Sequence, residues 1–284
     1  MSQNYKLFTD TASDLPEGIA AQYGIKEIPL RVFFGDEEVH PTIEEFYKRM
    51  RAGEIATTSA PNLEDFISRM EPVLQGGSDI LYLAFSSGLS ATCQAGRLAA
   101  KELEEKYPGR TVRVVDTLAA STGFGLLVTL AARKKEEGMG LAELADWVEE
   151  TKLHLCHWFT VDDLMFLKRG GRVSAAAAIA GTLIGIKPVL HVDNEGHLIP
   201  MAKVRGRRAS IAKLCEKVKE TAIDPASQTM MICHGDCIED ANEAAEFMRS
   251  ELGVPEVLIA PTGPVIGAHS GPGTLALFFL GTER

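Results

Sequence analysis

Short apolar runs alternate with helical patterns along the first half of the chain. The runs starting at Lys6 and at Leu81, and the segment Thr111–Thr117, are typical of buried strands. The second run leads into a helical pattern that carries Ala95, Leu98, Ala99 and Leu103, and the third leads into a helix over 121–135. A further amphipathic helix is expected over 141–155. This alternation predicts an α/β fold with a mostly parallel, doubly wound sheet.

Local signals add detail between the first two strands. Ser13 or Asp14 is expected to cap a helix that Pro16 opens. Ile28–Val39 has the pattern of a hairpin that turns at Gly35 and Asp36. Two amphipathic helices follow, the first opened by the capping box from Thr42 to Glu45 and the second capped by Asn62.

The second half has a different pattern. A strand over His157–Val161 and a short helix ending in the segment 168–172 precede a nearly all-apolar helix over 174–186, which Pro188 ends. A hairpin turning at Asp193–Gly196 comes next, then alternating helices and strands. These elements predict an α+β domain with a mixed or antiparallel sheet, so we expect domains at 1–155 and 156–284.

Composition excludes several classes of protein. The 284 residues are 45% hydrophobic and 24% charged, which is typical of a globular protein. A net charge of −10 argues against a general nucleic-acid surface. The N-terminus lacks an apolar signal core, no apolar stretch is long enough to span a bilayer, and five irregularly spaced cysteines do not suggest disulfides. We therefore expect a cytoplasmic protein.

Hydroxyl side chains gather where the strand from Leu81 gives way to a helix; they are Ser86, Ser87, Ser90 and Thr92. Free amides and the helix dipole make such a junction suitable for a carboxylate or a phosphate. No acidic residue lies between Asp79 and Glu102 to oppose an anion. The alternative is an ordinary serine N-cap.

A second hydroxyl group, Thr57–Ser59, lies in a loop that Pro61 stiffens. Two such loops in an α/β fold suggest one shared pocket. Neutral hydrogen bonds net only about 0.5–1.5 kcal/mol each, so they would orient a ligand that gains affinity from an apolar body, at about 0.8 kcal/mol per buried CH₂. The apolar helix over 174–186 could line a tunnel for that body.

Three further features are candidates for the same pocket. Asp10 ends the first strand too early to act as a cap, so a functional role is the better interpretation. His269 and Ser270 lie in a glycine-rich turn over Thr262–Thr274, where the backbone can approach closely; a purely structural histidine is the alternative. A strand reaching Leu280 follows this turn.

Arg169, Arg172 and Arg205 lie near glycines and suit a phosphate or an acidic partner, or else a solvated surface. Cys233–Cys237 lacks paired zinc-ligand spacing, so we expect no metal site and no cofactor. The sequence has no nucleotide-binding or dinucleotide-binding glycine motif and no nucleophile elbow. A Ser90–His269 dyad, as in a serine hydrolase acting on lipid esters, stays open, although no orienting acid is evident.

Five segments together carry a resemblance to a known family. They are Phe8–Leu15, Thr58–Pro61, Ser86–Thr92, Leu167–Val173 and Gly267–Thr274, in that order and across the whole chain. The set resembles the DegV family, the fatty-acid-binding B subunits of bacterial fatty acid kinase. One departure is Ala91, where the family usually has glycine; this change tightens the turn without removing a donor.

The resemblance implies a function. A long-chain fatty acid such as palmitate, stearate or oleate would lie between two domains. Thr58 and Ser90 would bind its carboxylate, with Ser59 beside them and His269 completing the network. Arg172 and Arg205, and with them Arg169, would face the phosphate or the kinase catalytic subunit, which makes the acyl phosphate. The chain would then be a carrier that touches membranes only transiently; a binder of small phosphorylated ligands is a further alternative.

Overall fold

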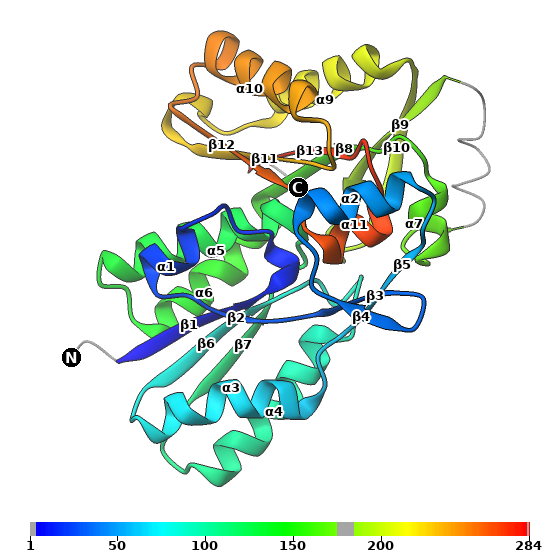
Figure 1. Cartoon of the computed structure of the whole chain (residues 1–284). Coiled ribbons are helices and arrows are strands. Elements are labelled where there is room, and N and C mark those ends of the chain that lie inside the picture. The colour runs from blue at the N-terminus through cyan, green and yellow to red at the C-terminus, as the bar shows by residue number, and fades with distance from the viewer. Residues whose placement is uncertain (1–3, 175–184, 283) are drawn as a thin grey trace.

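The computed structural model describes residues 4–174, 185–282 and 284. The first sheet is parallel, as predicted, with the order β2-β1-β6-β7. Its strands are β1 (Tyr5–Asp10), β2 (Lys26–Ile28), β6 (Asp79–Ala84) and β7 (Val112–Asp116). The carboxyl ends of these strands point toward the middle of the molecule (Figure 1). In open α/β sheets, ligands bind at this end of the strands.

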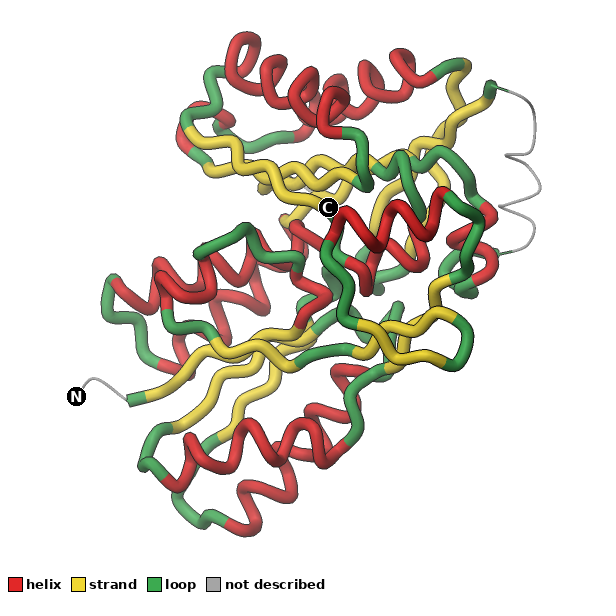
Figure 2. Tube along the Cα trace, in the orientation of Figure 1, coloured by secondary structure: helices red, strands yellow, loops and turns green. Residues whose placement is uncertain are grey.

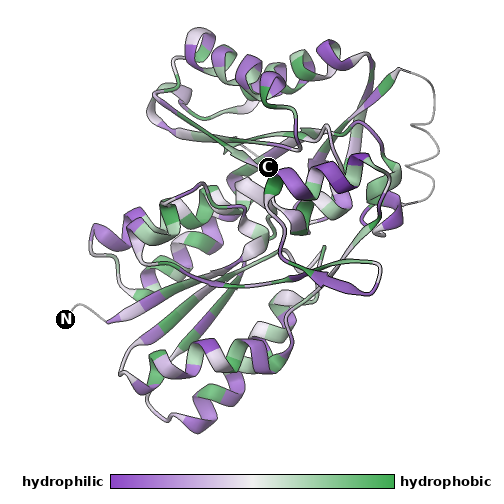
Figure 3. Cartoon of the chain, in the orientation of Figure 1, coloured by the Kyte–Doolittle hydropathy of each residue, from purple (hydrophilic) through white to green (hydrophobic). Residues whose placement is uncertain are grey.

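Helices cover both faces of this sheet. Helices α3 (Leu63–Gln75) and α4 (Thr92–Lys106) pack on one face. The other face is covered by α5 (Ser121–Glu136) and α6 (Leu141–Thr151), with the short α1 (Ile19–Tyr23) beside α5. Strands β6 and β7 and helix α5 consist mostly of apolar residues (Figure 3), which explains why they are buried.

A small antiparallel sheet, β4-β3-β5, extends from the first sheet. It consists of β3 (Arg31–Phe34), β4 (Glu37–Val39) and β5 (Ala56–Ser59), and the turn falls at Gly35 and Asp36 as predicted. Helix α2 (Ile43–Arg51) opens with the predicted capping box, and Asn62 caps α3. This sheet carries Thr58 into the middle of the molecule.

The second sheet is mixed and has the order β10-β9-β8-β13-β11-β12, in which only β11 and β12 are parallel. Its strands are β8 (Leu155–Thr160), β9 (Ile186–Val192), β10 (Leu198–Arg205), β11 (Thr229–His234), β12 (Glu256–Pro261) and β13 (Leu275–Leu280). Helices α9 (Arg207–Thr221) and α10 (Ile238–Leu252) cover its outer face (Figure 2). The predicted α+β arrangement is confirmed.

Helix α5 lies between the two sheets, because it also contacts β8, β11 and β13. One continuous apolar core therefore runs from Tyr5 and Leu7 in the first sheet to Phe278 in the second. The predicted domain boundary at 155/156 falls at the start of β8 and stays a prediction. The remaining helices, α7 (Met165–Arg169) and α11 (Pro264–Ser270), pack against each other, and three single 3₁₀ turns complete the described elements, at Thr11–Ser13, Lys152–His154 and Pro225–Ser227.

Three local predictions differ from the structure. The expected glycine-rich turn around His269 is helix α11, with Gly263 as N-cap and Pro264 at its first position, where a missing amide costs nothing. Helix α1 starts after Gly18 and not at Pro16. Residues 175–184 of the expected apolar helix lie outside the described residues, and its predicted end is wrong because Ile186 and Pro188 belong to β9.

Candidate functional site

A cavity of about 390 Å³ lies where the two sheets, β5 and α11 meet. Its volume is within the range of about 300–1,000 Å³ that is usual for small-molecule sites. Most of the lining is apolar, from Leu30, Ala60, Phe85, Leu89, Ala91, Ala120, Phe159, Leu167, Val192, Leu198, Val265, Ile266, Ala276 and Phe278. Both halves of the chain contribute to this lining, so the cavity exists only in the folded protein.

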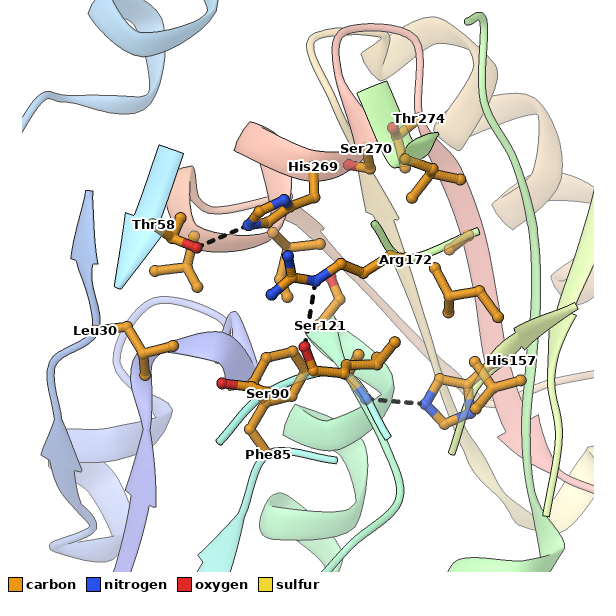
Figure 4. A pocket seen from close by; sticks show the side chains of 18 of the residues that line it. Leu30, Thr58, Phe85, Ser90, Ser121, His157, Arg172, His269, Ser270 and Thr274 are labelled. Carbon is orange, nitrogen blue, oxygen red and sulfur yellow. Dashed lines mark hydrogen bonds between the residues drawn. The ribbon is translucent and has the colours of Figure 1, made fainter. Parts of the chain in front are cut away.

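Two predicted residues meet at one part of the cavity. Thr58 Oγ1 lies 2.7 Å from His269 Nε2 (Figure 4). Thr58 is on β5, paired with Val32 of β3, and His269 is near the end of α11, which packs against β5. The hydrogen bond therefore joins two loops that the sequence analysis assigned to one pocket.

Glycines let His269 reach this position. A Cβ atom on Gly170 would lie only 2.3 Å from His269 Nδ1. A Cβ on Gly267 would lie 2.8 Å from atoms of both Phe46 and Tyr47, so α11 can pack against α2 only with glycine there. The expectation that glycines allow close approach is confirmed for Gly267, whereas the role of Gly170 was not foreseen.

The electrostatic setting of His269 favours a neutral ring. Burial, and then the positive charge of Arg172, lower the pKa of His269 to about 4. The imidazole is therefore uncharged near neutral pH and has one donor and one acceptor nitrogen. Among the described residues that line the cavity, Arg172 is the one with a permanent positive charge.

The three candidate arginines lie in different places. Arg172 lines the cavity, is half-buried, and donates its Nε–H to Leu89 O at 3.2 Å. Among the described residues no carboxylate pairs with Arg172, so its charge is available to an anionic ligand. Arg169 is exposed, with its guanidinium 5.4 Å from the Phe166 ring centre, and Arg205 is exposed at the end of β10.

Of the four hydroxyls between β6 and α4, only Ser90 lines the cavity. Its Oγ lies 2.8 Å from Thr92 Oγ1 and accepts a hydrogen bond from Thr92 N at 3.3 Å. Ser90 therefore contacts the first residue of α4, but the N-cap of this helix is Ala91 and no side chain caps it, so the alternative of an ordinary serine N-cap is wrong. Thr92 itself is fully buried behind it.

Ser86 and Ser87 do not reach the cavity. The buried Ser86 Oγ donates to Gly196 O at 2.9 Å and thereby ties this loop to the β9–β10 turn. The Ser87 side chain is exposed, and its amide donates to Asp116 Oδ1 at 3.2 Å. The sequence around this loop contains no acidic residue, but the fold places Asp116 beside it, because Asp116 ends the neighbouring strand β7.

Asp10 also lies outside the cavity lining, and the expectation that it is too early to cap is wrong. Its carboxylate accepts hydrogen bonds from Ala12 N at 3.1 Å, from Phe85 N at 3.0 Å and from Tyr82 Oη at 2.7 Å. The residue is fully buried, and burial raises the pKa of Asp10 to about 6. Asp10 holds the ends of β1 and β6 together, close behind the site.

Two further candidates line the cavity. Ser59 is largely exposed at its rim, with Oγ 3.2 Å from Ala60 O. Ser270 is 4% exposed, and among the described residues its hydroxyl has no hydrogen-bond partner. Both positions agree with the predicted pocket, although only Ser270 is enclosed.

Sequence reasoning missed several polar residues of the lining: Ser121, His157, Cys233 and Thr274. Ser121 follows β7 at the start of α5, so the rule that strand ends form sites would have found it. Its Oγ lies 2.6 Å from Asp14 Oδ2. The others come from strands of the second sheet or from the loop before β13, whose position relative to the first sheet the sequence does not encode.

The alternatives of metal and hydrolase chemistry gain no support. Within residues 4–174, 185–282 and 284, no group of three or more His, Cys, Asp or Glu side chains could hold a metal ion. Cys237 Sγ instead approaches Thr274 O at 3.2 Å. For the Ser90–His269 dyad, the His269 nitrogen that faces a hydroxyl faces Thr58. No described helix combines the length and the apolar character that crossing a bilayer requires.

Comparison with known proteins gives a consistent result. A family model described as an uncharacterised protein of the DegV family matches residues 4–282. A DegV domain-containing protein of Clostridium perfringens is 42% identical over 288 residues, covering 99% of both chains. A DegV lipid-binding protein from Thermotoga maritima has a TM-score of 0.87 at 32% identity, covering 99% of this chain and 100% of its own.

A second solved structure, reported for the fatty-acid binding of a DegV family protein from Thermus thermophilus, has a TM-score of 0.86 at 32% identity. It covers 97% of this chain and 99% of its own. These matches extend over nearly every residue, including the five segments that carry the resemblance in the sequence. The chain belongs to the DegV family.

Proposed function

We propose that this protein binds a long-chain fatty acid in the cavity between the two sheets. The observation that carries the proposal is an apolar cavity of about 390 Å³ with Thr58, Ser90, His269 and Arg172 gathered on its lining. An apolar body with a single anionic group fits such a lining. The relatives from Thermotoga maritima and Thermus thermophilus, described respectively as lipid-binding and fatty-acid-binding, support the same class of ligand.

The carboxylate binds to the hydroxyls of Thr58 and Ser90, with Ser59 at the rim. The His269 ring is neutral, so it keeps Thr58 oriented without forming an ion pair. Arg172 contributes a positive charge that no described acidic side chain neutralises. Most of the affinity comes from the acyl chain, since each CH₂ removed from water contributes about 0.8 kcal/mol and each neutral hydrogen bond about 0.5–1.5 kcal/mol.

The protein acts as a carrier and not as a catalyst, and presents its ligand to a separate ATP-dependent fatty acid kinase in the cytoplasm. The chain has no phosphate-binding glycine loop of its own. Arg169 and Arg205 are exposed and available to a kinase or to the phosphate that it transfers. This part of the proposal is tested by adding a fatty acid kinase catalytic subunit and ATP to the loaded protein and measuring acyl phosphate, with Arg205→Gln as the weakened variant.

Mass spectrometry of the purified protein, under native and then denaturing conditions, tests the proposed ligand directly. We expect an extra mass in the native spectrum that disappears on denaturation and equals one long-chain fatty acid. Protein that carries no such mass and takes up neither added palmitate, stearate nor oleate would rule the proposal out. Labelling of Ser90 by a fluorophosphonate would instead favour the hydrolase alternative.

A further inference from the structure

The outer side of strand β7 is the free edge of the first sheet. The order β2-β1-β6-β7 gives β7 a neighbouring strand on one side only (Figure 1). Successive peptide groups of a strand point to alternate sides, and those of Thr111 and Thr117, which flank β7, form hydrogen bonds with β6. The peptide groups of Val112, Val114 and Asp116 therefore face outward, away from the sheet.

Side chains close both ends of this edge and leave its middle open. Val112 N donates to Glu104 Oε1 at 2.9 Å, and Lys152 Nζ donates to Asp116 O at 2.8 Å. Outside the pairing of β6 with β7, no hydrogen bond of the described residues involves Val114. An open edge of this kind can pair with a further strand. The two capped ends restrict such pairing to the middle of β7 and thereby fix its register.

A hollow of about 330 Å³ lies along the open edge, between β7 and helix α4. One side of the hollow comes from α4, with Arg97, Ala100, Lys101 and Glu104, and the other comes from the chain over 111–114. An extended peptide can add to an exposed sheet edge, where its main chain supplies affinity and the neighbouring side chains supply specificity. The hollow provides both elements, because an open strand edge and the side chains of a helix lie next to each other there.

The lining of this hollow is basic, although the chain as a whole has a net charge of −10. Arg97, Lys101 and Arg113 line it, against the single acid Glu104, whose carboxylate accepts the hydrogen bond from the Val112 amide. Neither arginine forms an ion pair with a described residue, and Lys101 approaches its nearest acidic partner, on the next turn of α4, only at 4.0 Å. The hollow therefore has positive charge available for a partner.

A strand added beside β7 would meet these cations on both of its faces. Val112 and Val114 pack in the core on the α4 side of the sheet, so Arg113 projects to the opposite side, because side chains alternate along a strand. Side chains on one face of the added strand would lie near Arg97 and Lys101, and those on the other face near Arg113. Acidic side chains suit both faces. A second copy of the same edge would bring like charges together, which disfavours self-pairing.

We propose that the open edge of β7 is a docking site for a protein that presents an extended acidic segment, which adds a strand to the first sheet in the hollow beside α4. Pairing with the main chain at Val114 supplies affinity, and Arg97, Lys101 and Arg113 select acidic sequences. None of the described residues lines both this hollow and the apolar cavity, so the two sites are separate. The inference goes beyond the proposed fatty-acid function and does not depend on it.

The test titrates the full chain with a short fluorescein-labelled peptide of alternating glutamate and threonine and follows its anisotropy at low ionic strength. A matched peptide of alternating lysine and threonine is the control. We expect the acidic peptide to bind about tenfold more tightly than the basic one, with an affinity that falls as salt is added. Failure of the acidic peptide to bind, or equal binding of the two peptides, would overturn the inference.

Hydrogen exchange separates strand pairing from attraction by charge alone. The bound peptide should slow exchange of the Val114 amide, which faces outward, and change that of the Val112 amide less, because Glu104 already accepts its hydrogen bond. Polyphosphate, an anion without a peptide main chain, should leave exchange at Val114 unchanged. Unaltered exchange at Val114 in the saturated peptide complex, or equal slowing by polyphosphate, would contradict the added strand.

Variants then locate the binding site. Lys101→Glu should weaken binding of the acidic peptide about fivefold, whereas Lys26→Glu, which reverses an exposed lysine on β2 at the other side of the same sheet, should leave it unchanged. Val114→Pro removes the outward amide at a position where an edge strand tolerates proline, and should abolish binding. Both Lys101→Glu and Val114→Pro should still bind oleate as the wild type does, which shows that they are folded. Equal peptide affinities in the two lysine variants would refute the site, whatever the result for Val114→Pro.

Discussion

Thr58 Oγ1 and His269 Nε2 lie 2.7 Å apart although 211 residues separate them in the chain. The contact joins the small antiparallel sheet to helix α11 and defines the polar part of an otherwise apolar cavity. Because His269 is neutral, the pair is a hydrogen bond between uncharged groups and not an ion pair. The proposed carboxylate site thus contains no buried acid–base pair at this contact.

Replacing Thr58 by valine keeps the β-branched shape of the side chain but removes its hydroxyl. We expect fatty-acid binding to weaken about tenfold, since one hydrogen bond to the carboxylate and the orientation of His269 are both lost. Titration of the delipidated variant with oleate measures this. Thr57→Val is the matched control, because Thr57 is exposed on the same strand and does not line the cavity; equal affinities in the two variants would contradict the site.

Gly170→Ala should damage the site without removing any polar group. The added Cβ would lie 2.3 Å from His269 Nδ1, so the ring has to move away from Thr58. We expect a loss of oleate affinity similar to that of Thr58→Val, with little additional loss when the two changes are combined, because both act on one contact. Gly140→Ala, where no atom lies within 4 Å of the new Cβ, controls for the substitution itself.

Arg172 and Arg169 can be separated by experiment. Arg172→Gln should weaken binding of the fatty-acid anion about tenfold and reduce its dependence on salt, because Arg172 is half-buried on the cavity lining. Arg169→Gln should leave binding unchanged, since Arg169 is exposed and does not line the cavity. Titrations with the fatty acid at low and high ionic strength check both predictions. An equal loss of affinity in the two variants would contradict a direct contact between Arg172 and the carboxylate.

The pH dependence of stability should reveal the neutral state of His269. Its pKa is about 4 in the folded protein against an ordinary value of 6.5, so between these values the unfolded chain binds a proton that the folded protein does not. The free energy of unfolding should therefore fall as the pH drops from about 6.5 toward 4. Asp14 and Asp10 act in the opposite sense, because burial raises their pKa values to about 7 and about 6.

A comparison with His269→Gln isolates the histidine from these carboxyl groups. Between pH 7 and pH 5 the wild-type protein should lose about 2 kcal/mol more unfolding free energy than the variant. Urea titrations at the two pH values provide the measurement. Equal losses in the two proteins would mean that His269 is protonated as readily in the folded state as in the unfolded chain.

Local chemistry determined much of the fold. The capping box at Thr42, the helix cap at Asn62, the turn at Gly35 and the alternation of strands and helices each depend on neighbours within a few residues, and each was predicted correctly. Predictions that needed distant partners were less successful. The residues of α11 contain three glycines and histidine in or beside a short segment, so the sequence suggested a turn, whereas packing of Gly267 against Phe46 and Tyr47 favours a helix.

For the site, the sequence alone determined which residue types could orient a carboxylate and, through its motifs, the family to which the chain belongs. The residue pattern could not rank the hydroxyls that follow β6, and only the family resemblance singled out Ser90, because it is the tertiary structure that turns Ser90 to the cavity while Ser86 binds the β9–β10 turn. It likewise gave no sign that Ser121, Cys233 and Thr274 line the same cavity. These residues come from different elements, and their distances depend on how the second sheet packs over α5, a relation that no local pattern encodes.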